Sequence, residues 1–138
     1  MIFLDMKGKF FMIHSRNLHD ESKPYLTELT NGREGVEPVI SDSSAKGGAN
    51  MSPSELLQAA LAGCTNMTAR ELLDERGIPF DDIFVDVKME RIDGRTVITR
   101  SVKIISSAPD DVIREVIKEA QKCYVGRILT GEIEVNDE

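Results

Sequence analysis

The pattern of apolar and polar positions is clearest in the middle of the chain, where it predicts one long helix from Ser52 to Gly77. Ser52 can cap the first turn, Pro53 suits the first helical position, and Glu55 stands where a capping box places its carboxylate. Gly77 can adopt the left-handed conformation that ends a helix. About 25 residues at about 1.5 Å each make a rod of roughly 37 Å, which is long for a small protein.

The two halves of this predicted helix differ in polarity. Residues 56–64 read LLQAALAGC and are apolar or small on nearly every side. A helix without a polar face must be covered on several sides. Charged residues after Cys64 supply a solvated face beside a continuing apolar stripe. We therefore expect the first half to be covered and the second half to lie nearer the surface.

Downstream of this helix, apolar and polar residues alternate with the two-residue period of a half-buried strand. The alternation begins at residue 82, Asp93-Gly94 supplies a tight turn, and the pattern resumes as far as residue 106. It predicts a β-hairpin over residues 82–106.

A second helix is predicted to begin at Pro109, where two aspartates follow in the positive first turn. Apolar residues then recur at three- and four-residue spacing from Val112 to Cys123, so we expect the thiol of Cys123 to point inward from this helix. Gly126 is expected to break the helix. Residues 132–135 are expected to add a final strand.

The N-terminal part has weaker patterns. Short apolar runs at residues 1–6 and 9–14, and a weak alternation at residues 25–30, predict strands. Residues 33–51 are rich in Gly, Ser, Pro and Asp and predict a long ordered loop. The resulting order of strands, long helix, hairpin, helix and strand predicts an α+β fold in a single domain, residues 1–138.

Composition narrows the classes of partner. The 138 residues are 41% hydrophobic, which is enough for a real core. The net charge of -7 opposes binding to nucleic acids and to anionic membrane surfaces. The first apolar run is too short for a signal peptide, and no window approaches the length of a membrane span. We therefore expect a cytoplasmic protein that binds neither nucleic acid nor membrane.

The two cysteines, Cys64 and Cys123, are the candidate reactive groups. Each is predicted on the apolar face of a helix, and two such helices packed on one sheet could bring the sulfurs together. Buried cysteines often only fill space, so a structural role stays open. A zinc site is not expected, because the chain has no CxxC motif and its two histidines, His14 and His19, stand apart.

If the two cysteines take part in a reaction, one thiol would attack the substrate and the other would resolve the oxidised form. A thiolate that attacks a peroxide oxygen becomes a sulfenic acid, and a nearby thiol condenses with it to a disulfide. Apolar surroundings raise the pKa of a thiol, and the middle of a helix gives little help from the dipole. This chemistry therefore requires a neighbouring cation, and an arginine is expected to supply it.

Two sequence stretches resemble a known family. The stretch NMSPSELLQAALAGCT at residues 50–65, followed by AQKCYV at residues 120–125, is similar to the OsmC/Ohr family of small thiol-dependent peroxidases. The resemblance covers most of the chain from about residue 31 onward. It implies an intertwined homodimer in which antiparallel sheets pack around long central helices, with active sites at the interface. Such a dimer would cover the small-residue half of the first helix.

The resemblance also implies roles for individual residues. Cys64 corresponds to the family's peroxidatic cysteine and Cys123 to its resolving cysteine. Members hold an arginine and a glutamate beside the reactive sulfur. The arginine comes from the N-terminal region, where Arg33 is the first candidate and Arg16 the second.

Two positions depart from the family pattern. The family's glutamate directly follows the proline of the motif, whereas here Ser54 takes that place and Glu55 comes one position later. One position is a rotation of about 100° around a helix, so Glu55 is either the acidic catalytic partner or only the helix cap. Many members have proline after the second cysteine, where this chain has Tyr124. Both departures suggest an OsmC-like subgroup.

The implied activity is the reduction of organic hydroperoxides by a Cys64 sulfenic acid and a Cys64–Cys123 disulfide. The aliphatic character of both predicted helices suits an apolar substrate. By resemblance the reductant is a dithiol, either a protein-bound lipoyl group or a thioredoxin-like protein, and no cofactor is implied. The alternative is a non-peroxidatic member that binds an apolar small molecule, with the cysteines as a slow redox sensor or without redox function.

Overall fold

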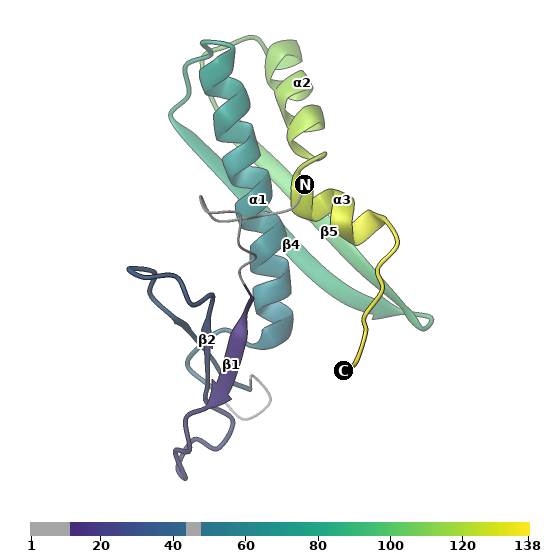
Figure 1. The fold of residues 1–138 in the computed structure, drawn as a ribbon. Helices are drawn as coiled ribbons and strands as arrows, with labels where there is room; N and C mark the ends of the chain where they lie inside the picture. Colours follow the sequence, from purple (N-terminus) through teal and green to yellow (C-terminus); the bar gives the residue numbers. More distant parts are fainter. Residues whose placement is uncertain (1–11, 44–47) are drawn as a thin grey trace. The chain divides into compact units, whose positions relative to one another are not determined.

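The computed structural model describes residues 12–43 and 48–138 (Figure 1). The chain divides into two compact units, Met1–Leu56 and Leu57–Glu138. Antiparallel sheets and three helices make up the described part, so the predicted α+β class is confirmed.

The first unit holds a three-stranded antiparallel sheet in the order β1-β2-β3. The strand predicted at residues 25–30 is confirmed as β2. The strand predicted at residues 1–6 lies outside the described residues, and the one predicted at residues 9–14 meets β1 only at His14. The bounds are β1 His14–Asn17, β2 Thr27–Thr30 and β3 Val39–Ser41.

The segment at residues 33–51 is not the continuous loop that its composition predicts, because it contains β3. Val39 lies opposite Leu29 of β2, and Ile40 lies opposite Glu28. β-branched residues such as Val39 and Ile40 suit a pleated surface once a partner strand is present. The neighbouring strand therefore outweighs the loop-forming residues around it.

The long helix α1 spans Pro53–Glu75, as predicted. The backbone N–H of Ser52 donates to the Glu55 carboxylate at 3.1 Å, and the Glu55 N–H donates to the Ser52 hydroxyl at 3.3 Å. These two hydrogen bonds are the predicted capping box. Gly77 follows the helix with a φ of 63°, the left-handed conformation that favours glycine.

Removing the side chain of Ser52, the helix cap, is expected to lower the stability of the protein measurably. Ser52→Ala removes the hydroxyl that accepts from the first turn, and we expect the free energy of unfolding to fall by about 1 kcal/mol. Ser52→Gly is the matched control, with an expected loss of only about a few tenths of a kcal/mol. Urea denaturation of the three proteins measures both. Equal midpoints for the alanine variant and the unchanged protein would contradict this role of Ser52.

One stripe of α1 is buried at four-residue spacing. The first half of the helix is less covered than the sequence predicts, since Leu57 is 43% exposed. Further along, Met67 is 74% exposed, so this side of the helix faces away from the interior of its unit. The buried residues of the helix are Leu61, Thr65, Ala69 and Leu73.

The second unit contains the predicted hairpin, with β4 at Asp82–Ile92 and β5 at Arg95–Ile105. Asp93 and Gly94 both have positive φ, at 50° and 77°, which is typical of a type I′ turn. The half-buried positions of the two strands alternate with exposed ones. They are Ile83, Val85, Val87 and Met89 on β4, and Ile98, Arg100, Val102 and Ile104 on β5, with Val97 as an additional half-buried position next to Ile98.

Helices lie along this hairpin (Figure 1). The Asn66 side chain on α1 donates to the Ile83 carbonyl of β4 at 3.0 Å. Arg76, directly after α1, pairs with Glu119 on the next helix, α2 (Asp110–Ala120). The core of the unit is aliphatic, and Leu73 and Val116 are its largest fully buried hydrocarbon side chains.

The C-terminal part differs from the prediction in two ways. The second predicted helix is divided into α2, Asp110–Ala120, and α3, Tyr124–Thr130, so Gly126 lies inside a helix and does not end one. Cys123 stands between the helices as the N-cap of α3. The strand predicted at residues 132–135 is wrong, since residues 131–138 form no regular element in the structure and lie exposed, without a partner strand.

Candidate active site

The two cysteines lie on neighbouring elements of the second unit. Cys64 sits on α1 and is partly exposed, whereas Cys123 is only 1% exposed at the start of α3. The thiol of Cys64 is near enough to Cys123 to act on its ionisation. The structure thus brings together the pair on which the sequence-based mechanism depends. Both thiols are free.

Three groups surround the sulfur of Cys123. The Thr65 hydroxyl on α1 lies 3.4 Å from Sγ, and the backbone N–H of Gly126 donates to Sγ at 3.4 Å. Nη1 of Arg100, on β5, lies 3.7 Å from Sγ and 3.0 Å from the Thr65 hydroxyl oxygen. The sulfur therefore faces three potential hydrogen-bond donors and one positive charge.

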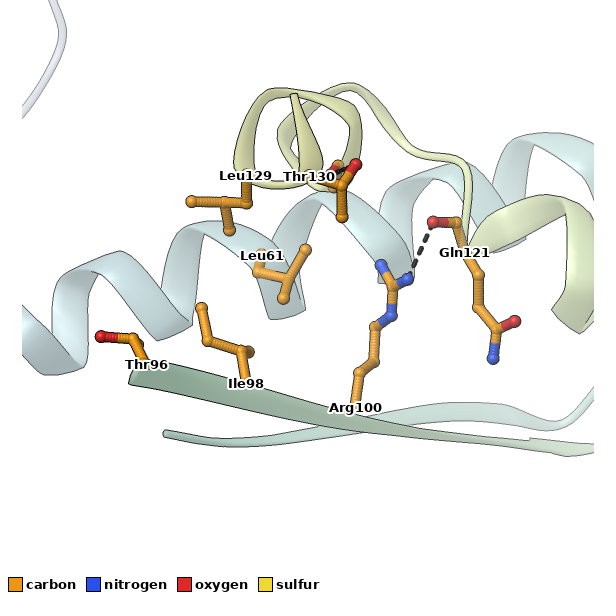
Figure 2. Close-up of a pocket in the computed structure, with 8 residues that line it drawn as sticks. Leu61, Thr96, Ile98, Arg100, Gln121, Leu129 and Thr130 are labelled. Atoms are coloured by element: carbon orange, nitrogen blue, oxygen red, sulfur yellow. Dashed lines mark hydrogen bonds between the residues drawn. The ribbon is translucent and has the colours of Figure 1, made fainter. Parts of the chain in front are cut away.

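The backbone carbonyl of Gln121 anchors Arg100 in this position. Nη2 of Arg100 donates to that carbonyl oxygen at 2.8 Å (Figure 2). The turn between α2 and α3 thus holds the guanidinium, while Nη1 reaches the sulfur of Cys123. A planar guanidinium with several fixed donors suits this double contact better than a lysine would.

Gly126 leaves room for the cluster. A Cβ at this position would lie 3.3 Å from both Sγ of Cys123 and Nη1 of Arg100, and 3.2 Å from the Gln121 carbonyl. Contacts of that length are tighter than most side chains make, so a larger residue would push the arginine or the sulfur away. The residue predicted to break a helix instead allows the close approach of the thiol and its cation.

Opposing effects set the ionisation of Cys123. Burial disfavours the thiolate and raises the pKa of the thiol. The Thr65 hydroxyl and the Gly126 N–H lower that pKa by hydrogen bonding, and the Cys64 thiol and the charge of Arg100 lower it further. The lowering effects prevail, so the pKa of Cys123 lies below that of an ordinary thiol. A larger share of Cys123 is therefore thiolate at neutral pH.

A cavity of about 360 Å³ opens beside this cluster, between α1, β5 and α3 (Figure 2). Leu61, Ile98 and Leu129 give it an apolar wall, and Arg100 borders it at one end. Its remaining lining is Thr96, Gln121, Gly126 and Thr130. The cavity can hold a small molecule that has both apolar and polar parts.

Sequence reasoning missed Arg100 and Thr65. A signal for Arg100 is present, because it occupies an inward position of β5 between Ile98 and Val102, where the alternation calls for an apolar residue. It lies directly opposite Val87 of β4. A charged residue on the apolar face of a strand needs a partner, and the thiol cluster provides one. Thr65 gives no comparable signal beyond its place next to Cys64.

The other sequence-selected residues belong to the first unit. Arg33 is exposed in the segment between β2 and β3. Arg16 on β1 pairs with Glu28 on β2 at 3.3 Å. The Glu55 carboxylate accepts from the Ser52 backbone, and this hydrogen bond, followed by the one with the Ser52 side chain, lowers its pKa. Capping is thus the interaction that Glu55 makes within its unit.

Neither a metal cluster nor a membrane helix is found among residues 12–43 and 48–138. No three His, Cys, Asp or Glu side chains of this part gather as a metal site would require. None of its helices combines the length and apolarity that a membrane crossing needs.

The sequence profile of the family OsmC-like protein matches residues 45–138. This chain belongs to the OsmC-like family. No curated protein matches it significantly.

Solved structures show the same OsmC-like fold. An OsmC-like protein from Mycoplasma pneumoniae is 19% identical, with a TM-score of 0.72 and coverage of 89% of each chain. The organic hydroperoxide resistance protein OhrB of Bacillus subtilis is 19% identical, with a TM-score of 0.59 and coverage of 88% of this chain and 90% of the other. A third is an organic hydroperoxide resistance protein OsmC from Legionella pneumophila, 14% identical, with a TM-score of 0.58 and coverage of 88% and 90%.

Proposed function

We propose that this OsmC-like protein is a thiol-dependent peroxidase that reduces organic hydroperoxides. The observation that supports it most directly is the pairing of a partly exposed thiol, Cys64, with a buried thiol, Cys123, whose pKa is lowered by its neighbours. A structural cysteine in a core needs no cation, whereas Arg100 faces this one. Two solved structures with this fold carry the name of organic hydroperoxide resistance proteins.

The proposed reaction assigns attack to Cys64 and resolution to Cys123. The Cys64 thiolate attacks the terminal peroxide oxygen, the O–O bond breaks, and the alkoxide takes a proton and leaves as the alcohol. Cys64 becomes a sulfenic acid. The Cys123 thiolate then attacks the Cys64 sulfur, a disulfide forms, and hydroxide leaves as water after protonation. A dithiol, such as a lipoyl protein or a thioredoxin-like protein, returns two electrons.

The exposure of the two thiols favours this order. Cys64 is partly exposed and accessible to a peroxide, whereas Cys123 is almost fully buried. The lowered pKa of Cys123 supports the resolving step, because the attacking thiol must be a thiolate when it meets the sulfenic acid. The apolar wall of the nearby cavity, with Leu61, Ile98 and Leu129, suits the organic part of a substrate.

The resemblance extends the proposal to residues of the first unit and to a second copy of the chain. Arg33 is proposed to support ionisation of Cys64. Arg16 ranks second, because it is already paired with Glu28. Glu55 is proposed to assist in the same site besides capping α1.

A homodimer is proposed as well. Light scattering combined with size-exclusion chromatography would contradict it by giving the mass of one chain.

One direct test follows the disulfide. One equivalent of cumene hydroperoxide added to the reduced protein should form an intramolecular Cys64–Cys123 disulfide within seconds, read by mass spectrometry after acid quenching and alkylation. Cys123→Ser should instead stop at a Cys64 sulfenic acid, which dimedone traps. Two free thiols in the unchanged protein after prolonged exposure to the hydroperoxide would overturn the proposed peroxidase activity. That result would favour a non-peroxidatic protein that binds a ligand in the cavity.

A further inference from the structure

Arg100 contacts the sulfur of Cys123, one of the two sulfurs that the proposed cycle joins. Its guanidinium contacts the sulfur of Cys123 at 3.7 Å and is anchored to the Gln121 carbonyl at 2.8 Å. The charged and titratable groups that act on this sulfur are Arg100, on β5, and Cys64, on α1. The positive charge of Arg100 is therefore directed at the buried sulfur.

We propose that Arg100 is a catalytic residue of the regeneration step and fixes the direction in which the Cys64–Cys123 disulfide is reduced: the reductant attacks Cys64, and Cys123 leaves as the thiolate. This inference rests on the proposed function for its place in the cycle. It concerns the regeneration of the protein and assigns Arg100 no contact with the peroxide.

Leaving-group chemistry supports this direction. In thiol–disulfide exchange the sulfur that departs does so as a thiolate, and it departs faster when that thiolate is better stabilised. The negative charge that develops on Cys123 meets the Arg100 guanidinium and the Gly126 N–H. A positive group at that position also lowers the energy of the transition state, since the charge is partly formed there.

The Thr65 hydroxyl can rotate when Cys123 changes from a disulfide sulfur to a thiolate. Its single hydroxyl hydrogen can be donated to the Leu61 carbonyl, 2.8 Å away, or to the sulfur of Cys123, 3.4 Å away. Arg100 donates to the same hydroxyl oxygen and leaves that hydrogen free to point either way. A rotation of one hydroxyl thus adds a donor when Cys123 becomes a thiolate.

The exposure of the two sulfurs favours the same direction of reduction. Cys123 is 1% exposed and Cys64 is partly exposed, so an incoming thiolate reaches the Cys64 sulfur more easily. The first thiolate of the dithiol forms an S–S bond with Cys64 while the Cys64–Cys123 bond breaks and its electron pair passes to Cys123. The second thiolate of the dithiol then attacks the reductant sulfur of this mixed disulfide, which releases Cys64 as a thiolate and leaves the reductant as a disulfide. Two electrons are transferred in total.

The first experiment locates the mixed disulfide. Diamide oxidises the purified protein to the intramolecular disulfide, and a brief reaction with 2-mercaptoethanol is stopped with acid and mapped by peptide mass spectrometry. We expect the mercaptoethanol adduct almost entirely on Cys64 in the unchanged protein. In Arg100→Met we expect slower reduction and a larger share of adduct on Cys123. Adduct mainly on Cys123 in the unchanged protein would overturn the proposal, and so would the same rate and the same adduct on Cys64 in Arg100→Met.

The second experiment reads the Cys123 thiolate directly. In a Cys64→Ser background, absorbance at 240 nm is titrated against pH, and we expect Arg100→Met to move the midpoint to higher pH. Arg100→Lys, which keeps the charge, should recover part of the shift. Arg114→Met removes an exposed arginine of α2 and should leave the midpoint unchanged. An unchanged midpoint in Arg100→Met would overturn the proposal.

A replacement variant and the use of diamide separate this test from the test of the proposed function. If circular dichroism shows that Arg100→Met does not fold, Arg100→Gln replaces it, because it keeps hydrogen-bond donors without the charge. Diamide forms the disulfide without any peroxide step. A protein that fails to reduce hydroperoxides, but directs mercaptoethanol to Cys64 more completely than Arg100→Met does, would therefore contradict the proposed function and leave the role of Arg100 intact.

Discussion

Cys64→Ser is expected to lower hydroperoxide turnover by at least about a thousandfold, because a neutral hydroxyl is a far weaker nucleophile than a thiolate. The measurement is consumption of cumene hydroperoxide with dihydrolipoamide as the electron donor. The substitution removes only the sulfur from a partly exposed site, so the fold should be retained. Circular dichroism and the unfolding midpoint check that it is.

Cys123→Ser is the matched control for this prediction. It should still react with about one equivalent of peroxide, because Cys64 remains, and then stop without a resolving thiol. The reverse pattern, with activity lost in Cys123→Ser at the first equivalent and kept in Cys64→Ser, would assign attack to Cys123. The cation and lowered pKa at Cys123 make this a real alternative to test.

Leu73→Ala is expected to lower the free energy of unfolding by about 2–5 kcal/mol, because it removes a large side chain from a packed core and leaves a cavity. Leu73 is 0% exposed on α1, two helical turns beyond Thr65. Since α1 carries both Cys64 and Thr65, this loss would also loosen the thiol cluster. Guanidinium denaturation followed by circular dichroism measures the change.

Met67→Ala, on the same helix, is the control for Leu73→Ala. Its side chain is 74% exposed in the single chain, so the loss of stability should be within about 0.5 kcal/mol. A loss at Met67 as large as that at Leu73 would contradict the exposed position described for it. Equal, small losses at both positions would contradict the buried position of Leu73.

Local signals explain which parts of the fold the sequence could predict. The capping box of Ser52 and Glu55, with Gly77 at the other end, marks α1 because these residues act within a few positions of one another. Asp93-Gly94 and the alternation on both sides of it mark the β4–β5 hairpin for the same reason. The strand β3 was missed because its partner strand, rather than its own composition, stabilises it.

The break between α2 and α3 shows how a local pattern can mislead. The three- and four-residue spacing of apolar residues continues through Cys123, so it predicts one helix with an inward-pointing thiol. In the structure the thiol is inward, but Cys123 caps a new helix and its sulfur accepts from the Gly126 N–H. Periodicity reports which residues face the core and does not report where the backbone changes direction.

The sequence by itself determined the α+β class, the long central helix, the hairpin and the two cysteines worth attention, because each follows from residues close together in the chain. Only the tertiary structure decided that Arg100 and Thr65 meet Cys123. Arg100 is 23 positions from Cys123, and Thr65 is 58 positions from it. Contacts at such separations depend on how helices pack on the hairpin and on strand register, and short-range sequence patterns carry no record of either.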